Sequence, residues 1–295
     1  SNTTAANTTV IGAGAGDAIT TGNNNTCVGS NSLSTVTTGT ENVAVGTSAL
    51  AANTASNNTA VGGHALAANT SGTQNVAVGS ACLESNTTGG SNTALGHNSL
   101  SGNTEANGNT ALGHNTLSGS NTGNDNTCVG SGTLVSNTSG TGNVAVGAGI
   151  AGVDVAAMGL NTTGSNNVAM GRQALRSNTT ASNNTAIGKS ALLANTTGAD
   201  NVGLGKSAGD AITTGSSNIM IGSNSGTHAV NLTTGSNNIC IGSDSDVSAS
   251  GASGQIALGI DVSCTGDNNF TFGLASTDSN IAFGATSITA PSDVR

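Results

Sequence analysis

The sequence predicts an all-β chain folded as a parallel β-solenoid, and three observations lead to this prediction. A five-residue word recurs along the chain: Asn, then Thr, Val or Ile, then a small residue, then an aliphatic residue, then Gly. Successive words are mostly 17 residues apart, which is the length of one solenoid coil. The composition, with 45 Gly, three Phe and neither Trp nor Tyr, lacks the large side chains that fill a thick globular core.

The words define the coils. We count 18 of them and therefore expect about 18 coils within residues 1–284, followed by a tail at 285–295. One step is 16 residues, one is 20, two of 12 flank Gly159, and the last two shorten to 14 and 11. The closing glycines are Gly12, Gly29, Gly46, Gly62, Gly79, Gly96, Gly113, Gly130, Gly147, Gly159, Gly171, Gly188, Gly205, Gly222, Gly242, Gly259, Gly273 and Gly284.

Each word has the alternation of a short β-strand. The residue before the closing glycine is apolar, as at Val61 and Leu204, and we expect it to face a packed interior. The residue before that is small, most often Ala, which suggests a close approach of other backbone on that side.

A second apolar residue, usually Leu, follows each glycine by four positions and predicts a second short strand in each coil. A polar Asn-Thr turn then closes the coil, because Asn and Gly tolerate the backbone conformations of tight turns. Stacking of these turns would align Asn69, Asn86 and Asn103 into a ladder of side-chain amides along the axis.

Both faces of the strand word are apolar or small, and one chain can cover only one of them. We therefore expect copies of the chain to associate side by side along their length.

The words resemble the head repeats of trimeric autotransporter adhesins, which carry an Asn-x-Val-Ala-Ile-Gly-like word, approximated here by residues 75–79. The resemblance covers about residues 7–284. It implies a left-handed parallel β-roll assembled as a homotrimer. The usual step is longer here than in the adhesin repeat, so the turn carries extra residues.

The end of the chain, Ser-Asp-Val-Arg at 292–295, resembles the entry to an endosialidase-type intramolecular chaperone. Such domains trimerise phage and algal-virus fibres and then cut themselves off at a Ser-Asp bond. The resemblance implies an autocleavage junction between Ser292 and Asp293.

Composition argues against several other classes. Gly does not recur every third residue and Pro291 is the only proline, so the chain is not collagen-like. A net charge of −9 gives no basic footprint for nucleic acid, and no apolar run is long enough for membrane insertion. Five cysteines without a CxxC pair predict buried thiols rather than a zinc site.

No cluster of acids, bases or nucleophiles indicates catalysis, so we expect neither an enzyme nor a bound cofactor or metal. Asp244 and Asp246 are the closest carboxylate pair and are expected to be solvated turn residues. His97 and His114 share the position after a closing glycine in adjacent coils. Arg172, Lys189 and Lys206 share that position in three further coils, either as a solvated basic edge or as a contact for an anion or glycan.

These features favour a structural or adhesive fibre: a trimeric rod on a virion, as a tail or capsid fibre, for host attachment or spacing. The expected location is extracellular or on the virion surface, and the expected partners are copies of the chain and a host receptor or glycan. The alternative is a bacterial adhesin head of the autotransporter type. An ice-binding solenoid is less favoured because the second position of the word mixes Thr with Val, and a polysaccharide depolymerase would need a carboxylate cleft.

Overall fold

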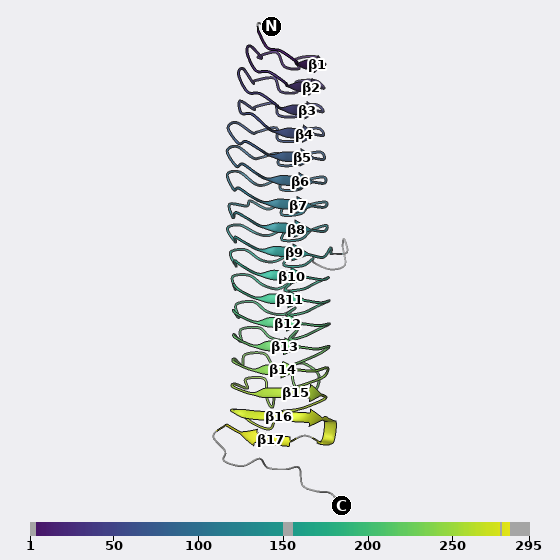
Figure 1. Cartoon of the computed structure of the whole chain (residues 1–295), viewed down its shortest axis with the longest axis vertical. Helices are drawn as coiled ribbons and strands as arrows, with labels where there is room; N and C mark the ends of the chain where they lie inside the picture. Colours follow the sequence, from purple (N-terminus) through teal and green to yellow (C-terminus); the bar gives the residue numbers. More distant parts are fainter. Residues whose placement is uncertain (1–3, 150–155, 278, 284–295) are drawn as a thin grey trace, which may run out of the picture. The chain divides into compact units, whose positions relative to one another are not determined.

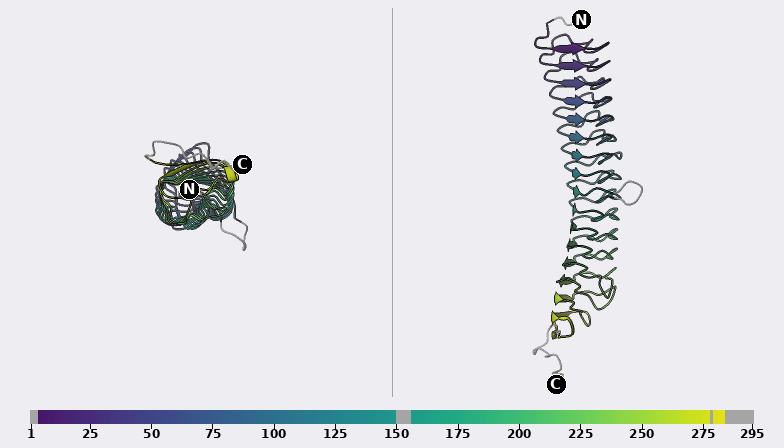
Figure 2. Two further views of the ribbon diagram at one scale, coloured as in Figure 1. Left: turned by 90° about the horizontal axis from the view of Figure 1, so that it is seen from below. Right: turned by 90° about the vertical axis from the view of Figure 1, so that its right-hand side faces the viewer.

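The structure of the chain is a computed structural model that describes residues 4–149, 156–277 and 279–283. It divides into two compact units, Ser1–Asn143 (unit 1) and Val144–Arg295 (unit 2), which we describe separately. Each unit is a parallel β-solenoid in which every coil contributes one short strand (Figure 1). In each unit the strands lie along one side of the coils and the turns along the other (Figure 2).

Unit 1 stacks eight strands among its described residues, and each strand pairs in parallel with the next. The partners are equivalent residues of successive words, as for Thr93 and Thr110, so the words lie in register. The strands are β1 (Thr9–Ile11), β2 (Thr26–Val28), β3 (Val43–Val45), β4 (Thr59–Val61), β5 (Val76–Val78), β6 (Thr93–Leu95), β7 (Thr110–Leu112) and β8 (Thr127–Val129).

Unit 2 continues the pattern with eight parallel strands and ends in an antiparallel one, β17, which pairs with β16. A single 3-10 turn, η1, connects β16 to β17. The elements are β9 (Val144–Val146), β10 (Val168–Met170), β11 (Thr185–Ile187), β12 (Val202–Leu204), β13 (Ile219–Ile221), β14 (Ile239–Ile241), β15 (Ile256–Ile260), β16 (Asn269–Leu274), η1 (Ala275–Thr277) and β17 (Ser279–Ala282).

The predicted solenoid and its 17-residue step are confirmed, but the expected number of coils is too high. Sixteen of the 18 words form parallel strands among the described residues. The word ending at Gly159 is not a coil, because β9 pairs directly with β10, and Met158 lies in a turn with its amide bonded to Ala174 of the next coil. The last word falls on the antiparallel strand β17 and on Gly284, which is outside the described residues.

The strand residues that face the interior of the coil are not the ones that the sequence predicted. From β2 to β14 the middle residue of the strand is buried, as for Ala94 and Ala111, whereas Leu95 and Leu112, which precede the closing glycines, are 45% and 43% exposed. A pleated strand sends alternate side chains to opposite faces, and the buried Asn before each strand from β2 to β14 shares the inner face with the middle residue. The prediction that the aliphatic residue before Gly faces the interior is therefore wrong.

Where a leucine lies four residues after the closing glycine, it fills the interior, but it does not form a second strand. Leu100 and Leu192 are fully buried and have φ of +53° and +49°, the left-handed conformation, within turns rather than strands. A Cβ added to Gly203 would lie 2.8 Å from Cγ of Leu192, so the leucine packs directly against the middle strand position. That packing leaves room there only for Ala, Cys or Gly.

One strand, β13, has a large residue at its middle position, and its surroundings support the same packing explanation. Met220 is the largest side chain at the middle position, and the leucine position is occupied by Gly209 and Gly226 in the coils beside it. A Cβ on Gly226 would lie 2.5 Å from Sδ of Met220. The methionine therefore fills the volume that leucine occupies elsewhere, which keeps the core close-packed.

Each closing glycine marks a close approach between successive coils. At Gly96, φ is +133°, and an added Cβ would lie 2.6 Å from the carbonyl oxygen of Gly113 in the next coil. Six of the closing glycines in unit 1 have φ from +121° to +137°: Gly46, Gly62, Gly79, Gly96, Gly113 and Gly130.

The predicted asparagine ladder is confirmed in unit 1. Nδ2 of Asn86 donates to Oδ1 of Asn69 at 2.8 Å, and Nδ2 of Asn103 donates to Oδ1 of Asn86 at 2.8 Å. A second ladder, which was not predicted, joins the buried Asn that begins each word: the backbone amide of Asn92 donates to Oδ1 of Asn75 at 3.0 Å. In unit 1 the two ladders provide hydrogen-bond partners for buried asparagine side chains of the turns.

The five cysteines are free and buried, as the sequence predicted. Burial raises the pKa of Cys27 to about 11 and that of Cys82 to about 12. It also raises the pKa of Cys128 and Cys240. These thiols are therefore packing residues that stay protonated at neutral pH.

Candidate functional site

The outer face of the strands is the most unusual surface of each unit. We call it the outer strip, and it consists of the first and third residues of every strand from β1 to β15, with Phe270 and Phe272 in the equivalent places of β16. The first residue is Thr, Val or Ile and the third is Val, Leu, Ile or Met, so the strip contains no charged residue. Leu95 in unit 1 and Leu204 in unit 2 are 45% and 43% exposed. The strip repeats at the strand spacing of about 4.8 Å.

The strip is more apolar in unit 2. There β13, β14 and β15 each begin with Ile, where many strands of unit 1 begin with Thr. A continuous apolar band along a sheet face is uncommon on a monomeric soluble protein and marks an interaction surface.

The three predicted anion-contact residues lie together at one edge of this strip. The amide of Ser190 donates to the carbonyl of Arg172 at 3.0 Å, and the amide of Ser207 donates to the carbonyl of Lys189 at 2.9 Å. This backbone pairing places Arg172, Lys189 and Lys206 one coil apart in a single column, with both lysines exposed. The shared position is therefore confirmed, while the bound anion or glycan stays a prediction.

His97 and His114 occupy the corresponding column of unit 1. Their rings stack with centroids 5.5 Å apart and planes at 12°, and both residues are exposed. Their shared position in adjacent coils is confirmed.

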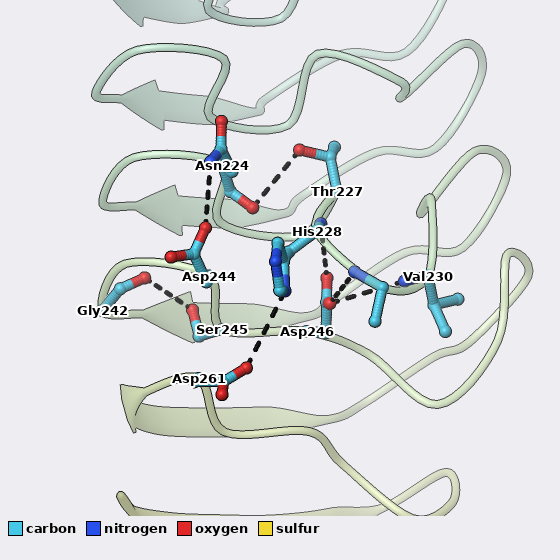
Figure 3. A network of polar contacts seen from close by, with 10 residues as sticks. Asn224, Thr227, His228, Val230, Gly242, Asp244, Ser245, Asp246 and Asp261 are labelled. Carbon is cyan, nitrogen blue, oxygen red and sulfur yellow. Dashed lines mark hydrogen bonds and ion pairs between the residues drawn. The ribbon is translucent and has the colours of Figure 1, made fainter. Parts of the chain in front are cut away.

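The prediction for Asp246 is wrong, because this residue is fully buried. The coil that ends at Gly242 is 20 residues long, and its extra residues form a loop around His228 (Figure 3). The Asp246 carboxylate accepts backbone hydrogen bonds from His228 at 3.1 Å, Ala229 at 2.5 Å and Val230 at 3.4 Å. It therefore acts as the anchor of that loop.

Both carboxylate oxygens of Asp246 accept hydrogen bonds from the loop amides. Burial raises the pKa of its carboxyl, while the three amides and His228 act in the opposite direction. Asp244 instead accepts a 2.9 Å hydrogen bond from Asn224, and His228 Nδ1 lies 3.8 Å from Asp261 Oδ1 at the surface. Among the described residues, no group of three or more His, Cys, Asp or Glu is arranged to hold a metal ion.

Two further sequence predictions concern the autocleavage junction and membrane insertion. Ser292 and Asp293, the residues of the predicted autocleavage junction, lie outside the described residues. Within the described part of the chain, no helix has the length and hydrophobicity required to cross a bilayer.

Comparison with known proteins adds no relative: no family model, curated protein or solved structure matches the chain.

Proposed function

We propose that the chain is a structural fibre protein, a homotrimeric rod displayed on a virion for host attachment or spacing. The outer strip is the observation that carries this proposal. It is apolar and uncharged, and it repeats once per coil along each unit. The proposal assigns the chain no reaction, cofactor or metal.

The partner that best fits the strip is another copy of the chain. A surface that repeats every 4.8 Å or so is covered along its length only by a partner with the same spacing. A second copy has that spacing, and burial of its own apolar strip is equally favourable. Because the strip carries no charge, identical strips can face one another without like-charge repulsion.

The width of the strip favours a small number of copies around one axis. Each strand contributes only two outward side chains, so each copy offers a narrow face. Three narrow faces can close around an axis and bury their Val, Leu and Ile side chains against one another. This arrangement agrees with the resemblance to trimeric adhesin repeats.

The function of such an assembly is mechanical. The coils are held together by backbone pairing and by the asparagine ladders, so the chain serves as a support that holds a receptor-binding element away from its base. Its place on a virion follows from the resemblance of the last residues to a fibre-chaperone junction.

The first test is the mass in solution, measured by sedimentation at micromolar concentration. We expect three times the chain mass of 27.9 kDa, and a monomer would overturn the proposal. A triple Glu variant in the strip should dissociate, because charges would be buried between copies. A matched triple Glu variant on exposed turns of the same region should stay assembled. The strip variant changes Ile187, Leu204 and Ile221, and the control changes Thr180, Thr197 and Thr214.

Both variants should keep the far-ultraviolet circular dichroism of the parent chain, because neither set fills the interior of the coil. Assembly of the strip variant to the same mass as the control would show that copies meet at another surface.

A further inference from the structure

At two positions that flank the strands of the outer strip, the charged residues differ in sign. The position directly after the closing glycine holds Arg172, Lys189 and Lys206 in unit 2 and never holds Asp or Glu. The position five residues before the closing glycine, at the other end of the strand, holds Asp200 in unit 2 and never holds Lys or Arg. We call these positions the basic edge and the acidic edge.

Unit 1 repeats the arrangement. The position of the basic edge holds His97 and His114 there, and the position of the acidic edge holds Glu41 and Asp125. The chain has a net charge of −9 and only five Lys and Arg residues. Three of them, Arg172, Lys189 and Lys206, lie on the basic edge of unit 2, and the others are Arg176 and Arg295. Their restriction to one edge of an apolar surface is therefore a marked asymmetry.

Asp200 and Lys206 do not neutralise one another within a chain. Asp200 and Lys206 are exposed and lie at opposite ends of the coil strand, with β12 between them. Neither Asp200, Lys189 nor Lys206 forms an ion pair with another described residue of its own chain.

Symmetry decides which edges meet when strips pack together. If the copies are parallel and related by rotation about an axis along the column, the strand of each copy points toward the start of its neighbour's strand. The basic edge of one copy then lies beside the acidic edge of the next. If two copies are antiparallel, related by a twofold axis along the strands, basic edge meets basic edge and acidic edge meets acidic edge.

We propose that these edges specify a parallel, in-register assembly in which Asp200 of each copy pairs with Lys206 of its neighbour, with Lys189 one coil away. The proposal rests on the self-association proposed above and adds the orientation, the register and the contact residues. The apolar strip supplies attraction without direction, and the charged edges exclude the antiparallel arrangement.

The first experiment is a charge exchange. Reversing one partner, by Lys206→Asp or Asp200→Lys, should weaken each interface about fivefold, at the upper end for exposed ion pairs. Over three equal interfaces this amounts to roughly a hundredfold rise in the dissociation constant. The double variant Asp200→Lys with Lys206→Asp keeps the net charge and recreates the pair with reversed polarity, so it should recover most of the loss.

Salt gives a readout that a purely structural role of these residues would not produce. The penalty of each single reversal should shrink from low salt to 1 M NaCl, where the screening length falls to about 3 Å. If the double variant is as weak as the two single losses combined at low salt, the pairing is wrong.

The second experiment tests geometry by crosslinking. A chain with Asp200→Cys and Lys206→Cys should form disulfides between neighbours under mild oxidation and run as a linked trimer on a non-reducing denaturing gel. Within one chain the two positions are separated by the whole strand, roughly 10 Å or more, which is too far for a disulfide. Each single Cys variant should stay unlinked, and the parent chain, whose five thiols are buried, is the control.

The outcomes separate this inference from the function on which it rests. A parent chain that assembles but gives no crosslink with the double Cys variant retains the fibre proposal and overturns the edge pairing. Crosslinking of Lys206→Cys to itself also overturns the pairing, since it requires like edges to meet. A monomeric parent chain overturns both proposals.

Discussion

The asparagine ladder of unit 1 gives a sharp test of how the coils are held together. The buried side chain of Asn86 makes three hydrogen bonds: Nδ2 donates to Asn69 Oδ1 at 2.8 Å and to the Gly89 carbonyl at 2.9 Å, and Oδ1 accepts from Asn103 at 2.8 Å. Asn86→Ala removes all three. Asn86→Asp has nearly the same shape but replaces the amide donor by a second acceptor.

The cost of Asn86→Ala follows from the bond count. At about 1 kcal/mol for each hydrogen bond, the free energy of unfolding should fall by about 3 kcal/mol. Asn86→Asp retains the bond from Asn103, but near neutral pH it places a charged oxygen against the oxygens of Asn69 and Gly89. Burial of that unpaired charge should make this variant less stable than Asn86→Ala at pH 7 by about 2 kcal/mol or more.

The difference should reverse at low pH. Burial raises the pKa of the introduced carboxyl in the folded chain above its unfolded value of about 3.9. The folded chain then binds the proton more tightly, so this stabilising contribution is fully present below the unfolded pKa and is lost as the pH rises through the folded pKa. When protonated, the carboxyl can again donate a hydrogen bond, and Asn86→Asp should be more stable than Asn86→Ala at pH 3.

The assay is urea denaturation followed by circular dichroism, with the two variants compared at each pH so that the other carboxylates cancel. If the difference in unfolding free energy between Asn86→Asp and Asn86→Ala stays constant from pH 3 to pH 7, this position is hydrated and the ladder does not hold the coils together.

Three further predictions test the interior, the thiols and the loop. Leu117→Ala should lower the free energy of unfolding by about 2–5 kcal/mol because Leu117 is fully buried, whereas Leu112→Ala on the outer strip should cost far less in unfolding and act mainly on assembly. Since burial raises the pKa of Cys82 to about 12, it should not react with a thiol reagent at pH 8 until denaturant is added, and rapid labelling of the folded chain would contradict its placement. Asp246→Ala should speed hydrogen exchange at the amides of residues 228–230, while Asp244→Ala should leave them protected, and equal exchange in the two variants would refute the anchoring role of Asp246.

The sequence was sufficient to predict whatever depends on the period alone. A fixed step places equivalent residues one above another, so the stacking of Asn69, Asn86 and Asn103 and the shared column of Lys189 and Lys206 follow without knowledge of the coil's shape. The close approach at the closing glycines was not predicted and is seen only in the structure, where an added Cβ at Gly96 would lie 2.6 Å from the carbonyl oxygen of Gly113.

The direction in which each strand faces could not be predicted from the period. Alternation divides Val76, Ala77 and Val78 into two faces but does not say which one is internal. The outcome depends on leucines such as Leu83, which reach the core from a left-handed turn that leucine rarely adopts. One signal was present: from β2 to β14 the middle position varies only among Ala, Cys, Gly and Met220, as expected where space is limited.

Asp246 was missed for a related reason. Its role arises because the coil before it is three residues longer than usual and leaves three amides that need an acceptor. An isolated Asp-x-Asp sequence does not reveal that requirement, although the irregular step before Gly242 was visible and marks where the regular pattern had to be supplemented.

Pairing between adjacent words also has a consequence for how such a chain can change in length. The strand β6 pairs with β5 and β7, and the amide bonds of Asn86 reach only the neighbouring turns. Deleting residues 80–96 would join Gly79 to His97, a residue in the same place as the lost Ser80, and would leave every remaining turn a suitable neighbour. Reach is therefore adjustable in whole increments of about 4.8 Å, through duplication or loss of single repeats, without redesign of any interior.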